Sequence, residues 1–269
     1  MGESIMKIIK SFQIAFAVLC MSATSCLGDP YSLKEDKAEE HVKHYNTLPY
    51  VGIADADLKT QPQFHDFLSR AREVIASYNG FSDHTGLRLV HRHFDLKPEN
   101  VVVQQFSTYE KTPSLISSAL PLAEALAKDA VPSGWVFGVS SPQIFEFSTD
   151  EAVKKDLHDI KSTPEFLEQM EIVIKDFHLE GLMSVSLLRN ASLVAQIGEV
   201  YQENTYDFGS VVQVIDAKKI VPTHIRTSWS FRGPRQVACE AWCQQYCSED
   251  QFSHHRDTKH WANHRQIMD

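Results

Sequence analysis

The stretch Gly86–Phe106 reads GLRLVHRHFDLKPENVVVQQF and predicts two β-strands joined by a turn. In its first half the side chains alternate between two faces, which is the period of a strand. The face that carries Leu87 also carries His91 and His93. A turn around Lys97–Pro98 separates this strand from the Val-rich run that follows it. The stretch therefore indicates a fold that contains a β-sheet.

Other segments repeat the strand pattern towards the C-terminus. The runs GWVFGV and QIFEFS predict two strands on either side of Ser141–Pro142. Four further β-rich runs follow in series: Leu182–Arg189, Leu193–Tyr201, Phe208–Ile215 and Ile220–Trp229. Sequential strands with short turns favour an antiparallel sheet over an alternation of strands and helices. The sheet is therefore predicted to be mainly antiparallel.

Two segments carry the 3.6-residue apolar period of an amphipathic helix. The first follows Thr60, which is placed to cap it, has Pro62 in its first turn and ends at Gly80. The second runs from Thr163 to Phe177. Together with the strands, these helices predict an α+β fold, a mainly antiparallel sheet with two amphipathic helices around a single core.

The remaining segments give weaker signals. Residues 29–59 are polar and mixed in charge, and we expect them to form an extended entry segment. Residues 112–130 are rich in Ser, Ala and Leu with Pro121 inside, which predicts a short or broken helix. We predict three parts of the chain: a signal peptide at 1–28, indicated by the residue pattern of the N-terminus, a globular domain at 29–235 and a Cys/His-rich tail at 236–269.

The segment HFDLKPEN also fits H-x-D-L-x-x-x-N, the catalytic-loop pattern of protein kinases. In a kinase, Asp95 would accept the proton of the substrate hydroxyl and Asn100 would bind magnesium. No Gly-rich loop precedes the segment, and the next aspartate is Asp129. The triplet Asp207-Phe208-Gly209 lies too far along the chain to form the second metal-binding hairpin. We interpret the match as coincidental and predict no nucleotide site.

The N-terminus has the three-part pattern of a secretory signal peptide. Two lysines precede an apolar run from Ile14 to Met21, and small residues suited to cleavage follow up to Gly28. The apolar run is too short to span a bilayer comfortably. Translation could also begin at Met6, and a buried N-terminal helix is the alternative interpretation. We predict a secreted protein without a transmembrane segment, in which Asn190 of the Asn-Ala-Ser sequon could carry a glycan.

Charge limits the partners that this chain can have. Its 26 Lys and Arg residues stand against 35 Asp and Glu residues, which gives a net charge of −9. An acidic surface repels phosphate backbones, so nucleic acid is not an expected partner.

The tail contains a set of residues with the spacing of a zinc site. Its ligands would be Cys243, Cys247, His260 and His264, which together form a Cys2His2 pattern. Cys239 also permits a Cys3His set, and a disulfide with one free thiol is a further alternative. A closed site of four ligands usually has a structural role. The sequence therefore allows a zinc ion in the tail.

The pair His91 and His93 is the second candidate metal site. Both side chains share one face of a strand, so both could bind one ion. A third ligand would be required, for example His84, His178 or His224. The alternative is that the histidines form hydrogen bonds with the sheet edge or with backbone carbonyls.

The segments Gly86–Val103 and Gly181–Asn204 resemble a group of uncharacterised fungal proteins that share an LLHRHF-x-L core. The resemblance covers about the central half of the chain, and Leu89-Val90 replaces the usual pair of leucines. It implies a fungal secreted protein and brings no known activity. The function that we expect is binding or interaction, and the alternative is a metal-dependent enzyme that uses His91 and His93.

Overall fold

The computed structural model of the chain describes residues 31–32, 38–138, 142–188, 193, 195–196, 199–206, 208–219 and 224–231, and the backbone of 240–249 and 258–267. The predicted signal peptide at 1–28 and the sequon at Asn190 lie outside the described residues. Nine strands form the main sheet: β1 Thr85–Leu89, β2 Asn100–Tyr109, β3 Thr112–Pro121, β4 Val131–Val136, β5 Gln143–Ser148, β6 Met183–Leu187, β7 Glu199–Tyr206, β8 Gly209–Asp216 and β9 His224–Ser230.

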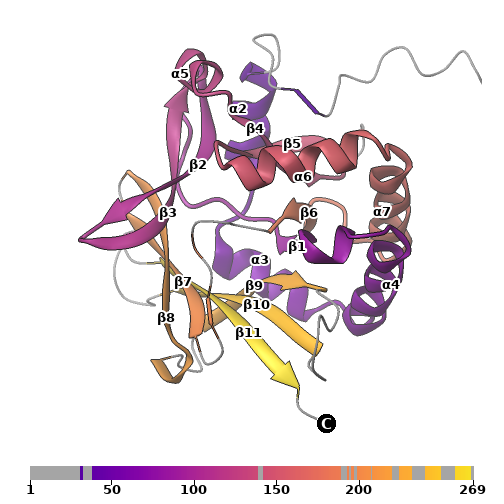
Figure 1. Cartoon of the computed structure of the whole chain (residues 1–269). Helices are drawn as coiled ribbons and strands as arrows, with labels where there is room; N and C mark the ends of the chain where they lie inside the picture. The colour runs from indigo at the N-terminus through magenta and orange to yellow at the C-terminus, as the bar shows by residue number, and fades with distance from the viewer. Residues whose placement is uncertain are drawn as a thin grey trace, which may run out of the picture. The chain divides into compact units, whose positions relative to one another are not determined.

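These strands lie in the order β9-β1-β6-β4-β5-β2-β3-β8-β7, and the sheet curls into a half-barrel (Figure 1). All neighbours in this order pair antiparallel except β2 and β5, where Val103 lies opposite Phe147 in a parallel pair. The backbone of β10 (Glu240–Glu249) pairs with β9, and that of β11 (Thr258–Ile267) pairs with β7. The predicted α+β class with a mainly antiparallel sheet is confirmed.

Six α-helices occur in the part of the chain that the structure describes, where the sequence predicted two amphipathic helices. They are α2 Ala38–Thr47, α3 Val51–Lys59, α4 Phe64–Ser77, α5 Leu122–Ala127, α6 Glu151–Lys161 and α7 Glu165–Asp176. Short 3₁₀ turns, η2 Phe81–Asp83 and η3 Ala217–Lys219, precede β1 and β9. None of the helices among the described residues is long and apolar enough to cross a membrane.

The two predicted helices correspond to α4 and α7, although the first begins later than expected. Thr60 ends α3, because its backbone N–H donates to the carbonyls of Asp57 and Leu58. Pro62 lies in the turn between the helices, and α4 starts at Phe64. The residue that was expected to cap α4 is thus the C-cap of the helix before it.

Two other expectations about secondary structure were wrong. Within residues 29–59, expected to be extended, Ala38–Thr47 and Val51–Lys59 form α2 and α3. Most of residues 112–130, expected to be a broken helix, form β3, and only the segment after Pro121 is helical, as α5. Pro121 is tolerated at this junction because it ends the strand and precedes the first helical residue.

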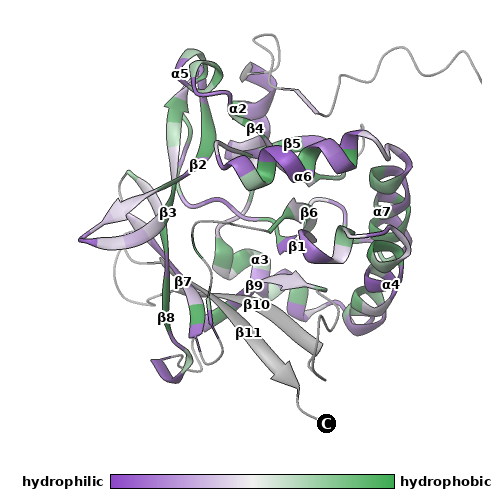
Figure 2. Cartoon of the chain, viewed as in Figure 1, coloured by the Kyte–Doolittle hydropathy of each residue, from purple (hydrophilic) through white to green (hydrophobic). Residues whose placement is uncertain are grey.

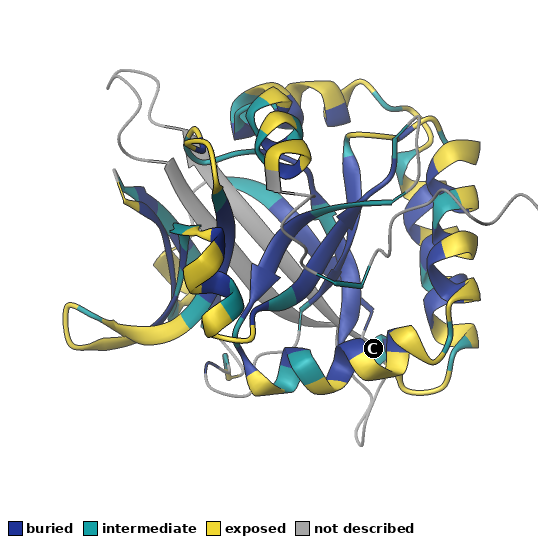
Figure 3. Cartoon of the chain, turned by 90° about the horizontal axis from the view of Figure 1, so that it is seen from above, coloured by how far each residue is buried: buried dark blue, intermediate teal, exposed yellow. Residues whose placement is uncertain are grey.

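The helices cover the sheet and enclose an apolar core. Helix α4 packs beside α7, and α6 packs on β4 and β6 (Figure 1). The core between them includes Trp135, Phe166, Met170 and Trp229, all buried. Helices α4, α6 and α7 carry hydrophobic residues along one side and hydrophilic residues along the other (Figure 2), and their exposed residues lie on the outer side (Figure 3). Burial of these faces is the main stabilising term for helices of this length.

The kinase-like segment lies in a loop that leads into β2. Asp95 is exposed and forms an ion pair with Arg92 at 2.8 Å, and Asn100 is the first residue of β2. An isolated bridge between Tyr50 and Arg92 lies immediately before the segment. The two residues that a kinase would use therefore have structural positions at the surface and at a strand end.

Candidate functional site

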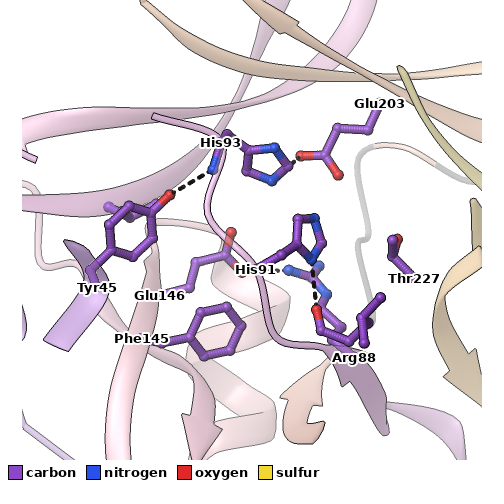
Figure 4. A pocket seen from close by; sticks show the side chains of 10 residues that line it. Tyr45, Arg88, His91, His93, Phe145, Glu146, Glu203 and Thr227 are labelled. Carbon is purple, nitrogen blue, oxygen red and sulfur yellow. Dashed lines mark hydrogen bonds and ion pairs between the residues drawn. The ribbon is translucent and has the colours of Figure 1, made fainter. Parts of the chain in front are cut away.

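A polar cavity contains both histidines of the HRH sequence (Figure 4). Its walls come from α2, β1, β2, β5, β7, β9 and the segment after β1. The lining residues are Tyr45, Arg88, Leu89, His91, His93, Val102, Phe145, Glu146, Glu203 and Thr227. The cavity has a volume of about 30 Å³. It can hold one or two water molecules or a single ion, and it is much too small for an organic ligand.

His91 is buried and held by the backbone. Its Nδ1 lies 2.7 Å from the carbonyl oxygen of Leu89, so Nδ1–H donates to that oxygen and Nε2 carries the lone pair. Burial, together with the neighbouring His93, lowers the pKa of His91 from 6.5 to about 3. The imidazole is therefore neutral at physiological pH. The alternative interpretation, a hydrogen bond to a backbone carbonyl, is confirmed for this residue.

His93 lies beside His91, but β1 ends at Leu89, so both histidines lie in the segment after β1 and not on the strand that the sequence predicted for them. The ring centroids are 4.8 Å apart and the ring planes are inclined at 75°. The Nδ1 atom of His93 lies 3.2 Å from Oγ1 of Thr205, and its Nε2 atom lies 3.4 Å from Oε1 of Glu203. The backbone N–H of His93 donates to the hydroxyl of Tyr45 at 3.3 Å.

Two buried glutamates face this pair from different strands. Glu203 of β7 accepts a short hydrogen bond from the hydroxyl of Ser210 on the neighbouring strand. Glu146 of β5 pairs with Arg88 of β1 at 2.6 Å and accepts a hydrogen bond from Ser117 at 3.2 Å. Burial raises the pKa of Glu146, and the Arg88 guanidinium opposes this change. Sequence reasoning had identified neither glutamate.

The histidines proposed as third ligands lie elsewhere. His178 follows α7 and lines a separate cavity of about 230 Å³ together with Gln61 and Phe64. His224 is the first residue of β9. His84 lies between η2 and β1, where it faces α6 rather than the HRH pair.

His84, Asp156 and Asp159 form a second group of ligand-bearing side chains. One ligand atom from each residue lies within 4.8 Å of the other two. The His84 Nε2 atom is 3.7 Å from Oδ2 of Asp159, and its Nδ1 atom is 3.0 Å from Oγ1 of Thr85. His84 and Asp156 are buried, whereas the side chain of Asp159 is 50% exposed. Such a group has the composition of a metal site with one side open to solvent.

The sequence of α6 contains a signal for this group. Asp156 falls within the buried stripe of α6, between Val153 and Ile160. A carboxylate at a core position of an amphipathic helix requires a positive or hydrogen-bonding partner. Asp159 lies three residues further on and thus on the same side of the helix.

For the predicted zinc site the structure describes only the backbone of β10 and β11. In their register, Cys243 lies opposite His264 and Cys247 lies opposite His260. Strand residues four apart are separated by roughly 13 Å, so this register groups the four positions as two facing pairs. The side chains lie outside the described residues, and a zinc ion in the tail stays a prediction.

Comparison of the chain with protein-family models, with curated proteins and with solved structures gave no match in any of the three. The resemblance to uncharacterised fungal proteins therefore stays a resemblance between short sequence motifs. Any functional inference must come from the geometry of the chain itself.

Proposed function

We propose that this protein binds a divalent metal ion through His84, Asp156 and Asp159 and acts by binding rather than by turnover. The observation that carries the proposal is the convergence of three ligand atoms within 4.8 Å of one another. They come from two elements, the junction before β1 and helix α6, so the tertiary fold brings them together.

The chemistry of the group supports a cation. Two carboxylates held this close repel each other, and a cation between them removes the repulsion. The contact between Nδ1 of His84 and the Thr85 hydroxyl orients the imidazole, as the outer partners of metal ligands commonly do. One nitrogen and two carboxylate donors suit Mn²⁺, Fe²⁺ or Zn²⁺ better than an ion that prefers only oxygen. The exposed side of Asp159 gives the ion a path from solvent.

Binding is favoured over turnover because of the dimensions of the other candidate site. An enzyme built on His91 and His93 would need room for a substrate beside its ion, and that cavity measures about 30 Å³. The enzyme hypothesis would be supported if a purified metal-loaded protein lost a reaction when His91 or His93 was changed.

Metal binding at α6 is testable by substitution. After removal of bound metal by a chelator, titration with Mn²⁺ or Zn²⁺ should show that Asp159→Asn binds one ion fewer than the wild type, or binds it at least about tenfold more weakly. Asp159 is half-exposed, so its replacement should leave the fold intact. Asp156→Asn should have the same effect if the variant folds.

Two controls belong to this experiment. Glu151→Gln removes an exposed carboxylate from the same helix, where it pairs only at the surface with Lys154, and should leave binding unchanged. Cys243→Ser reports separately on a zinc ion in the tail. Equal binding by the wild type, Asp159→Asn and Glu151→Gln would refute the site.

Export through the secretory route is the second part of the proposal, and it depends on the pattern of residues 1–28. Protein collected from the medium of a secreting eukaryotic host should begin close to Asp29 when its N-terminus is sequenced. A variant that lacks residues 1–28 should stay inside the cell. Recovery of the full-length chain from the cytosol, with none in the medium, would contradict export.

A further inference from the structure

We propose that a cavity at the ends of α4 and α7 binds a small neutral phenol, a single aromatic ring that carries a hydroxyl group. The two helices lie side by side (Figure 1), and the cavity lies where the turn between α3 and α4 meets the end of α7. It is lined by the turn residues 61–63, by Phe64 and by residues 177–179, which follow α7. None of these residues belongs to the metal-binding group on α6 or lines the polar cavity, so the site is independent of metal binding.

The volume of the cavity sets the size of the ligand. It measures about 230 Å³, whereas an apolar protein cavity of about 150 Å³ holds one benzene molecule. Sites for drug-sized molecules begin at about 300 Å³. The cavity therefore has room for one ring with small substituents and is smaller than the sites of drug-sized ligands.

Two phenylalanines give the cavity an aromatic wall. Phe64 and Phe177 are half-buried, so the core leaves part of each ring uncovered. The buried Phe67 contacts both rings, with centroid distances of 5.9 Å to Phe64 and 5.8 Å to Phe177, and Trp229 forms a T-shaped contact with Phe64 at 5.2 Å. These contacts fix the two rings in place, so an aromatic ligand meets a wall that is already formed.

The polar residues of the lining favour a hydroxyl group over an ion. Glutamine amides and a neutral imidazole carry both donors and acceptors, as a hydroxyl does, and the lining provides Gln61, Gln63 and His178. Nε2 of Gln61 lies 3.5 Å from the carbonyl oxygen of Asp57, a contact in which the amide oxygen of Gln61 takes no part. No Lys, Arg, Asp or Glu occurs among the residues given by the structure for this lining. A charged ligand would lose water here without gaining a partner of opposite charge.

The backbone of His178 is strained at the edge of this cavity. Its φ of 56° lies in the left-handed region that favours glycine. The N–H of His178 donates to the carbonyl of Lys175 and that of Leu179 to the carbonyl of Ile174, both at 3.0 Å, the pair of bonds that commonly closes a helix with glycine. Glycine would adopt this backbone without strain, so the histidine is unfavourable for the helix end itself. Strain of this kind occurs at binding sites, and it points to a role for the imidazole in the cavity.

4-Methylphenol is the probe, because it combines one ring with one hydroxyl group. Calorimetric titration of the purified protein in the presence of a chelator excludes any contribution from bound metal. We expect one molecule to bind with a dissociation constant of about 1 mM or below. 4-Methylcyclohexanol lacks the aromatic ring and 4-methylbenzoate carries a carboxylate in place of the hydroxyl, so each should bind at least about fivefold more weakly.

Two substitutions locate the site. His178→Gly should weaken the binding of 4-methylphenol at least about fivefold and should retain the fold, because glycine suits the positive φ. Phe64→Leu keeps an apolar side chain without the ring and should weaken binding by a similar factor. His65→Gln is the matched control, since His65 is exposed on α4 outside the lining, and it should bind as the wild type does. Circular dichroism checks that each variant is folded, and His178→Gly decides the result if Phe64→Leu does not fold.

Three results would overturn the proposal. The first is a wild-type protein that does not bind 4-methylphenol below about 10 mM. The second is binding by His178→Gly and Phe64→Leu as tight as that by His65→Gln, because the ligand would then lie elsewhere on the protein. The third is a probe series in which 4-methylbenzoate or 4-methylcyclohexanol binds as tightly as 4-methylphenol, because the site would then not select a neutral phenol.

Discussion

Replacing Arg88 with methionine is expected to lower the free energy of unfolding of the metal-free protein by about 3–5 kcal/mol at pH 7. Arg88 pairs with Glu146 at 2.6 Å, and the side chains are only 19% and 8% exposed. Methionine keeps much of the aliphatic volume but leaves the carboxylate buried without its cation. The remaining contact of Glu146, from Ser117, offsets only part of this cost.

The protonation of Glu146 provides a second test of the effect of Arg88→Met. Burial already raises the pKa of this carboxyl, and loss of Arg88 removes the group that opposes the rise. The carboxyl of the variant will therefore take up a proton more readily, and the destabilisation should shrink as the pH falls. Glu146→Gln in the Arg88→Met background should likewise recover much of the loss, because no buried charge remains.

Urea unfolding of the single and double variants measures both effects. Arg70→Met is the matched control, since Arg70 pairs with Glu73 at 2.8 Å with both side chains more than half exposed. Such a surface pair contributes about 0–1 kcal/mol. If Arg88→Met cost no more than Arg70→Met, the buried pair would have no special role in the stability of the sheet.

The strands were predictable wherever side chains alternate or β-branched residues cluster, as in β2 and β8. β3 was missed because its residues include three serines and two prolines, and because its hairpin has no turn signal in the sequence. Glu110 and Lys111 adopt positive φ of 48° and 68° in that turn, where Asn-Gly would be the usual signal. Pairing with β2 stabilises a segment whose own composition does not indicate a strand.

The two N-terminal helices were missed for a different reason. α2 and α3 have 10 and 9 residues, too few to be stable without packing. α2 buries His41 and Tyr45, polar or amphipathic side chains that do not mark an apolar face in the sequence. Their helical state therefore depends on the sheet that they cover.

The residues of the candidate sites could likewise be predicted only in part from the sequence. The sequence predicted that His91 and His93 lie close together on a strand, and both line one cavity, although β1 ends before them at Leu89. Glu203 could not be paired with them from sequence, because the contact of His93 with the β7 residue Thr205 spans 112 positions. The sheet order that brings β7 to this cavity follows from long-range strand pairing, which local patterns do not encode.

Acidification from pH 6.5 to below 4 is expected to cost the fold roughly 3 kcal/mol through His41 alone. His41 is buried in α2, with Nδ1 at 3.0 Å from the carbonyl oxygen of Ile144 and Nε2 at 3.5 Å from the backbone nitrogen of Val102. An amide N–H can only donate, so Nε2 accepts and Nδ1–H donates to Ile144. The neutral imidazole thus links α2 to both β5 and β2.

The loss of folding stability at low pH follows from the lowered pKa of His41. Burial lowers the pKa of His41 from 6.5 to about 4, with His44 contributing and the Ile144 carbonyl opposing. A histidine of the unfolded chain takes up a proton below about pH 6.5, whereas the folded chain resists it until about pH 4. Stability from this residue is therefore complete above pH 6.5 and is lost progressively as the pH falls. A difference of about 2.5 pKa units corresponds to the stated loss.

Chemical unfolding of wild type and His41→Gln between pH 7 and pH 4 isolates this contribution. Glutamine can donate to Ile144 and accept from Val102 without titrating, so the variant is expected to lose about 3 kcal/mol less than the wild type over this range. Its stability at pH 7 can be lower because the ring packing against Phe147 is lost, but that difference does not depend on pH. His65→Gln on the exposed side of α4 should follow the wild-type curve. If the stabilities of the wild type and His41→Gln changed with pH in parallel, His41 would take up a proton as readily in the folded chain as in the unfolded chain. That result would contradict the structure, in which Nε2 of His41 accepts from the backbone N–H of Val102.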